Sequence, residues 1–169
     1  LRREVYPRLR THLHFDNELR LFPEVHHCTK YSVNIYHTPQ TINFTTVANL
    51  FAVPAVDQSF LHSGAGVAEG IKNDNNKWST LGHKDRLVHI TEDQLALFAR
   101  LYDGEDTPAL EARLPSLHTT QLLTVLGNFA NYSSLLSDLT EEYKATVMWD
   151  EANAQKDHTI RRETQFPEC

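Results

Sequence analysis

Three neighbouring side chains in this sequence, His26, His27 and Cys28, are of the types that bind transition metals. Imidazole nitrogen and thiolate sulfur are the usual ligands of zinc, and the chain holds 10 histidines among its 169 residues. Adjacent side chains on a strand point to opposite faces, however, so neighbouring histidines there would not share one ion. The spacings typical of zinc sites, such as CxxC and HExxH, do not occur. We therefore expect no metal site, although metal or hydrolase chemistry through the histidines stays an alternative.

Gly64, Gly66 and Gly70 raise a second possibility, a glycine-rich loop that binds the phosphates of a dinucleotide. That motif reads G-x-G-x-x-G and directly follows a hydrophobic strand. Here the third glycine falls one residue too late, and no hydrophobic strand leads into the segment. We expect a flexible turn. No Walker loop or nucleophile elbow occurs in the sequence either.

An aromatic residue followed by proline, Phe22-Pro23, lies between two segments with the composition of strands, at 18–22 and 30–37. Together with the polar turn that separates them, these segments predict a hairpin. Proline has no amide hydrogen and ends a strand. Composition alone therefore favours a buried aromatic side chain at the end of the first strand.

The wider pattern of apolar, β-branched and turn-forming residues predicts an α/β chain. Expected strands lie at 18–22, 30–37, 41–53 and 86–90. Expected helices lie at 2–13, 54–62, 92–102, 119–136 and 140–152, and the fourth is the longest. Thr91 and Gln94 have the spacing of a capping box at the start of the third helix. Residues 62–85 carry loop signals, with Trp78 expected to hold the loop against the body, and the tail from residue 153 is expected to be irregular.

Charge and composition limit the possible functions. A net charge of −6 argues against a chain that binds nucleic acid by itself, because clustered Lys and Arg are needed to neutralise phosphates. One small basic group lies in residues 1–14, and a second consists of Lys156, Arg161 and Arg162. Each group could contact phosphate, although a solvated surface is the simpler expectation.

Three features bear on location and completeness. No apolar run approaches the roughly 20 residues of a transmembrane helix, and no signal peptide is recognised. Cys28 and Cys169 lie far apart in the chain, so we do not expect a structural disulfide. We therefore expect a cytoplasmic location. The first residue is Leu1 rather than Met, which suggests a piece of a larger protein.

Over its whole length the sequence resembles the adenine-specific (N6) DNA methyltransferases found in large type II restriction–modification and phage-defence proteins. The most specific parts of the resemblance are Phe22-Pro23 and the Asn-Ala-Gln-Lys-Asp segment at 153–157. The other similar segments are 2–3, 6–10, 31–36, 47–51, 70–72, Trp78, 82–83, 85–86, 148–151 and 159–162.

The resemblance implies a role for particular residues. In this family the target adenine is flipped out of double-stranded DNA, at a cost of a few kcal/mol, before its amine is methylated. Phe22, followed by Pro23, would stack on the flipped base, and S-adenosylmethionine would donate the methyl group. Candidate DNA contacts are the loop 62–85 and the basic residues Lys72, Lys156, Arg161 and Arg162.

Two motifs of the family do not occur: the glycine-rich cofactor turn and the Asn/Asp-Pro-Pro-aromatic motif that binds the amine. Both normally precede the Phe-Pro step, so the resemblance implies a fragment that is inert and binds no cofactor by itself. Residues 1–55 would be the last strands and a helix of a Rossmann-like methyltransferase sheet, completed by the remainder of the methyltransferase domain. Residues 56–169 would be a largely helical connecting or target-recognition segment. The main alternative is a non-catalytic protein-interaction or assembly module of a defence-system protein.

Overall fold

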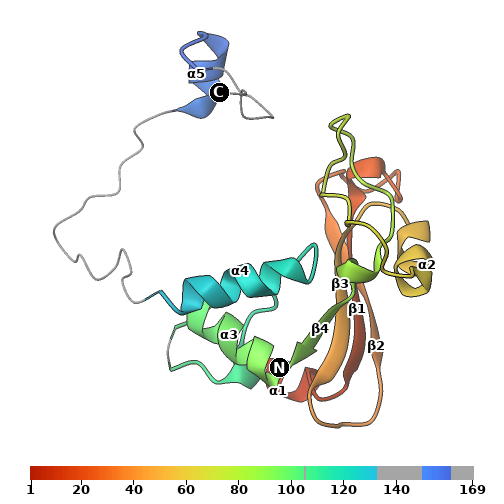
Figure 1. Cartoon of the computed structure of the whole chain (residues 1–169), viewed down its shortest axis with the longest axis vertical. Coiled ribbons are helices and arrows are strands. Elements are labelled where there is room, and N and C mark those ends of the chain that lie inside the picture. Colours follow the sequence, from red (N-terminus) through yellow and green to blue (C-terminus); the bar gives the residue numbers. More distant parts are fainter. Residues whose placement is uncertain (105, 133–149, 161–169) are drawn as a thin grey trace, which may run out of the picture. The chain divides into compact units, whose positions relative to one another are not determined.

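The computed structural model describes residues 1–104, 106–132 and 150–160 (Figure 1). The chain divides into two compact units, Leu1–Tyr132 and Ser133–Cys169. In the second unit the described part is a short helix, α5 (Glu151–Lys156), whose first turn is capped by Asp150: its Oδ1 accepts a hydrogen bond from the amide of Asn153 at 3.1 Å. The prediction of an irregular tail is therefore wrong for residues 153–156, because the cap at Asp150 starts a helix that includes them.

The first unit is built on a mixed four-stranded sheet, so its coarse class is α/β as expected. The strands are β1 (Leu9–Asp16), β2 (Lys30–Tyr36), β3 (Asn43–Leu50) and β4 (Val88–Thr91), in the order β2-β1-β3-β4. β1 pairs antiparallel with β2 and parallel with β3, and β3 pairs antiparallel with β4. Residues on both sides of the boundary expected at 55/56 thus contribute to one sheet.

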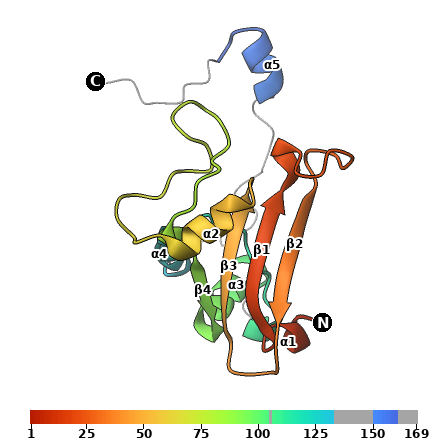
Figure 2. The same ribbon diagram turned by 90° about the vertical axis from the view of Figure 1, so that its right-hand side faces the viewer.

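Helices lie on both faces of this sheet. Figure 2 shows α2 (Pro54–Leu61) in front of β3, with α3 (Glu92–Tyr102) and α4 (Gln121–Ala130) behind the sheet. The remaining helix, α1 (Arg2–Val5), is a single turn before β1. None of the helices in the described ranges is long and apolar enough to cross a bilayer.

Several expected elements are confirmed because their signals are local. β2, β3, α2 and α3 form close to their predicted bounds. The capping box at the start of α3 is present, with the Thr91 amide and hydroxyl 3.0 and 2.6 Å from Oε1 of Gln94. The expected helix at 119–136 is present as α4 and is shorter than α3, while residues 133–149, with most of the helix expected at 140–152, lie outside the described part of the chain.

Two expected elements are wrong. The helix expected at 2–13 is one helical turn followed by β1, because this segment is the central strand that pairs with both β2 and β3. The strand expected at 18–22 is instead a 3-10 turn, Asn17–Leu19, which ends at Arg20 in the left-handed conformation with φ of 54°. The chain turns at Arg20, and residues 18–22 take no part in the ladders of the sheet.

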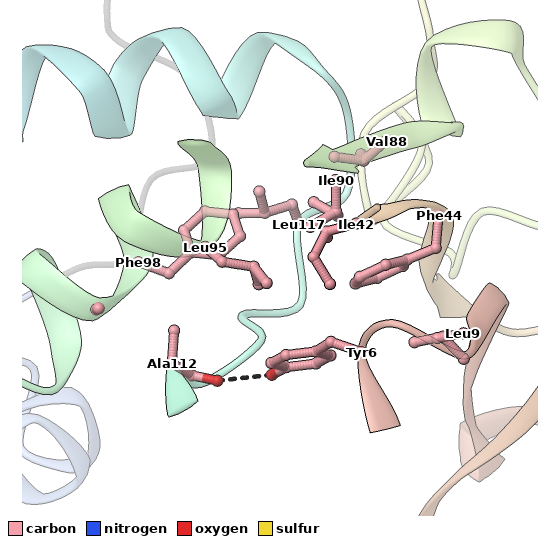
Figure 3. Close-up of a cluster of buried hydrophobic side chains, with 11 residues drawn as sticks. Tyr6, Leu9, Ile42, Phe44, Val88, Ile90, Leu95, Phe98, Ala112 and Leu117 are labelled. Carbon is pink, nitrogen blue, oxygen red and sulfur yellow. Dashed lines mark hydrogen bonds between the residues drawn. The ribbon is translucent and has the colours of Figure 1, made fainter. Parts of the chain in front are cut away.

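The main core lies between the sheet and α3. Its buried members are Tyr6, Leu9, Ile42, Phe44, Val88, Ile90, Leu95, Phe98, Ala99, Ala112 and Leu117. Figure 3 shows Leu95 and Phe98 of α3 directed toward the side chains of the sheet. The hydroxyl of Tyr6 donates a hydrogen bond of 2.6 Å to the carbonyl of Ala112, which ties the start of the chain to the segment after α3.

The long loop after α2 is held to this body. Trp78 stacks on the buried Phe51 with ring centroids 4.7 Å apart, as expected from the sequence. Gly82 lies directly against α2: a Cβ at this position would come within 2.4 Å of the backbone nitrogen of Ser59. The buried Arg86 donates to the carbonyls of Leu81, Ala48 and Asn49 at 2.8, 2.8 and 2.9 Å, and so joins the loop to the end of β3.

Candidate functional site

One face of the β1–β2 half of the sheet carries apolar side chains that no helix covers completely. Leu13 stands opposite Val33, and Phe15 stands opposite Tyr31. Directly opposed residues of an antiparallel pair share a face, so these four side chains lie together. Only Phe15 of the four is fully buried, which leaves apolar surface open on this face.

An open pocket of about 510 Å³ lies over this face. The strands supply its floor, the segment after β1 supplies Leu21 and Phe22, and α2 with the residue before it supplies the opposite wall. The lining residues are Leu13, Phe15, Leu21, Phe22, Tyr31, Val33, Val53, Val56 and Asp57. Asp57 is the one charged residue among them, so the pocket is suited to a flat apolar group with a polar edge.

In this pocket the ring of Tyr31 contacts the rings of both Phe15 and Phe22. Phe15 and Tyr31 are nearly parallel, at 5° with centroids 5.3 Å apart, and Phe22 meets Tyr31 edge-on at 72° and 4.9 Å. Phe22 is 52% exposed. Composition predicted a buried side chain, but the pocket leaves half of this ring free to contact another planar group.

The position of Phe22 depends on one fully buried polar residue, Asn17. The Oδ1 atom of Asn17 accepts from the Phe22 amide at 2.9 Å, and its Nδ2 atom donates back to the Phe22 carbonyl at 3.0 Å. The same Nδ2 lies 2.9 Å from the carbonyl of Val25 and 3.4 Å from that of His26. Asn17 therefore fixes the backbone of the whole turn between β1 and β2.

The other expected site residues are not brought to the pocket. Pro23 follows Phe22 in the exposed turn and does not line the pocket. Lys72 is exposed and its Nζ lies 4.5 Å from the centroid of the Trp78 ring, a cation–π contact in the long loop. Lys156 is exposed in α5 of the second unit, and Arg161 and Arg162 lie outside the described residues.

Two buried histidines of the first unit, His83 and His118, hold the long loop in place. The buried His118 lies with Nε2 2.9 Å from the carbonyl of Glu69, and its Nδ1 has no partner among the described residues. Burial lowers the pKa of His118, although the Glu69 carbonyl opposes this effect by accepting its hydrogen bond. The buried His83 lies with Nε2 3.3 Å from the carbonyl of Ala65. The lowered pKa favours the neutral form of His118, and the contacts of both histidines indicate a structural role.

Three residues of this site were not predicted from the sequence: Asn17, Tyr31 and Asp57. The alternating apolar residues Leu13 and Phe15 were a signal for β1 and for its pocket-facing side. Asn17 carried no comparable signal, because its burial depends on carbonyl groups that the turn brings around it.

Comparisons of the chain with protein-family models, with curated proteins and with solved structures find no match. The pocket and its three aromatic rings therefore have to be interpreted from their own geometry.

Proposed function

We propose that this chain forms the base-binding part of a DNA adenine-N6 methyltransferase of the restriction–modification or phage-defence type. The observation that carries the proposal is the half-exposed ring of Phe22 at an open pocket whose floor is Phe15 and Tyr31. A flipped base needs a flat apolar surface to replace the stacking that it loses, and base–aromatic stacking contributes roughly 1–3 kcal/mol.

Two features of the pocket suit adenine. The hydrogen bonds from Asn17 hold Phe22 in a defined position before any base arrives, which lowers the entropic cost of binding. The carboxylate of Asp57 at the wall of the pocket offers an acceptor for an exocyclic amine. Asp57 would orient the adenine, while the methyl donor, S-adenosylmethionine, would be held by the remainder of the methyltransferase domain.

The outer edge of β2 is where the remainder of the methyltransferase domain would join this sheet. Among the described strands, β2 pairs only with β1, so its outer edge offers seven residues of unpaired backbone. In this proposal the sheet is the terminal part of a Rossmann-like methyltransferase sheet, and the missing strands add to β2. Lys72, Lys156, Arg161 and Arg162 would contact the phosphates of double-stranded DNA.

The test measures adenine methylation of duplex DNA by the full-length protein with labelled S-adenosylmethionine. We expect Phe22→Ala to lower kcat/KM by roughly 5- to 150-fold, the equivalent of one lost stacking contact. Phe22→Tyr should retain most of the activity because it keeps an aromatic ring. The matched control is Phe60→Ala, since Phe60 is 51% exposed on α2 but does not line the pocket.

Equal activity of Phe22→Ala and Phe60→Ala would remove Phe22 from the base site. Absence of adenine methylation by the unaltered full-length protein would refute the proposed activity itself.

A second candidate function is a non-catalytic assembly module. It is favoured by the same edge strand, on which Val33, Ile35 and Tyr36 are each about half exposed. Such an edge can bind a partner by strand addition. Under this alternative, Ile35→Lys abolishes association with the partner protein, whereas Phe22→Ala changes neither association nor any modification of DNA.

A further inference from the structure

The turn between β1 and β2 brings together three side chains that were not expected to share a metal ion. Adjacent residues on a strand point to opposite faces. Residues 26–28 do not form a strand, however: the amide of Thr29 donates to the carbonyl of His26 at 3.0 Å, which closes a tight turn. In this turn one ligand atom from each of His26, His27 and Cys28 lies within 4.8 Å of the other two.

We propose that His26, His27 and Cys28 bind a divalent transition-metal ion of the zinc type. The spacing fits such an ion, because a tetrahedral site with Zn–S of about 2.3 Å and Zn–N of about 2.0–2.1 Å holds sulfur and nitrogen roughly 3.6 Å apart. The Sγ atom of Cys28 lies 3.6 Å from Nε2 and 3.4 Å from Nδ1 of His27. Nitrogen and sulfur ligands select zinc-like ions over magnesium and calcium, which prefer oxygen.

A fourth side chain, Glu18, orients one of these ligands. Its Oε2 lies 3.2 Å from Nδ1 of His27 and can accept the proton of that nitrogen. The lone pair of the neutral ring then belongs to Nε2, which lies 3.6 Å from Sγ of Cys28. A carboxylate that accepts from the second nitrogen of a metal-bound imidazole is the usual support of a zinc ligand.

His26 is also prepared to bind through one nitrogen. Its Nδ1 accepts a hydrogen bond of 3.3 Å from the amide of Cys28, so this atom carries a lone pair directed into the turn. Its ring lies 4.6 Å from that of His27. Binding through Nδ1 exchanges this long hydrogen bond for the ion, with no change of tautomer.

The backbone that carries these ligands is fixed before an ion binds. The side chain of the buried Asn17 donates to the carbonyls of Val25 and His26. The backbone amide of Asn17 donates to the carbonyl of Thr29 at 3.0 Å. Three protein ligands leave the fourth position of a tetrahedral ion for water or an external ligand, since all three side chains are at least partly exposed.

The test titrates the full chain with Co²⁺, which reports thiolate ligation by a charge-transfer band in the near ultraviolet, and then displaces it with Zn²⁺. We expect one ion per chain and loss of the band in Cys28→Ser. Cys169→Ser is the matched control, because it removes the other thiol of the chain and should keep the band. Glu18→Gln should keep the band and weaken the affinity about 10- to 100-fold.

Circular dichroism of each variant separates loss of the site from loss of the fold. The proposal is overturned if the unaltered chain gives no thiolate band, if the band persists in Cys28→Ser, or if it disappears in Cys169→Ser. An affinity of Glu18→Gln equal to that of the unaltered chain would remove Glu18 from the site. Adenine methylation is not part of these measurements, so the outcome is independent of the proposed enzymatic role.

Discussion

Two regions of one sheet differ in how they are covered. Over β3 and β4, apolar side chains such as Phe44 and Ile90 are buried by α3 and the segment after it, and the core is closed (Figure 3). Over β1 and β2, the apolar face is open, and Phe22, Val33 and Ile35 are each about half exposed. The sheet alone therefore does not decide which apolar face becomes a core.

The two regions also differ in what stabilises them. The closed core is held by packing of apolar side chains, as in most domains. Around the open pocket and the long loop, buried polar side chains bind backbone carbonyls of irregular segments: Asn17 at the β1–β2 turn, Arg86 at the end of β3, and His118 at Glu69. We call these three buried side chains polar anchors. They can fix a loop while leaving the neighbouring surface free to bind another molecule.

The largest expected effect on the free energy of unfolding comes from a comparison of two phenylalanines. Phe98→Ala empties a fully buried position in the closed core and should lower the free energy of unfolding by about 3–5 kcal/mol. Phe22→Ala should cost less than about 1.5 kcal/mol, because half of its ring is already in water. Urea unfolding with both variants checks this. Equal losses would mean that the pocket is part of the stabilising core.

Arg86 tests the polar anchors. Burial lowers the pKa of its guanidinium to about 10, and the negative charge of Glu69 opposes this effect, so the group stays protonated at neutral pH. Arg86→Met leaves the carbonyls of Leu81, Ala48 and Asn49 without their donors and should cost about 3 kcal/mol. The matched control is Arg100→Met on the exposed face of α3, which should be nearly neutral in the same unfolding experiment.

Asn17 tests whether the open pocket is positioned by hydrogen bonds. Asn17→Ala removes the acceptor of the Phe22 amide and the donors to the Phe22 and Val25 carbonyls, at an expected cost of about 2 kcal/mol. Hydrogen exchange of the Phe22 amide should become much faster. Asn75→Ala, in the exposed part of the long loop, is the control and should leave that amide unchanged. Unchanged protection in Asn17→Ala would mean that packing alone holds the turn.

The same comparison explains what could be predicted from the sequence. α3 was predicted because its signals are local: the Thr91–Gln94 box at its start and the apolar positions Leu95 and Phe98 along one face. β1 was assigned to a helix because the four-residue spacing of Leu9 and Leu13 fits the period of a helix as well as that of a strand. Its pairing with residues 45–47 depends on a segment more than thirty positions away, which no local pattern contains.

The form of the pocket was not predicted from the sequence, and the base-stacking role of Phe22 stays a prediction. Phe22 was singled out, but its exposure depends on Tyr31 and Val56, which reach the pocket only when the sheet and α2 are assembled. The rejection of His26, His27 and Cys28 rested on strand geometry that the turn does not have. Buried polar anchors escape prediction for a similar reason: burial of Asn17 is a property of the closed turn and not of its neighbours in sequence.

The smallest expected effect is the response of two histidines to acid: the buried His118 and the half-buried His14, whose Nδ1 lies 3.2 Å from the hydroxyl of Ser116. Burial lowers the pKa values of His118 and His14 in the folded chain, whereas the unfolded chain takes up protons near the ordinary value of about 6.5. Their contribution to stability is complete above about pH 6.5 and is lost as the pH falls from there toward the lower folded pKa. We expect the free energy of unfolding to decrease as the pH falls below about 6.5. His118→Gln, which can still donate to Glu69, should make this dependence shallower, and His89→Gln on the exposed part of β4 should not. An unchanged slope in His118→Gln would show that the His118 anchor does not titrate with unfolding, and would assign the acid sensitivity to other groups.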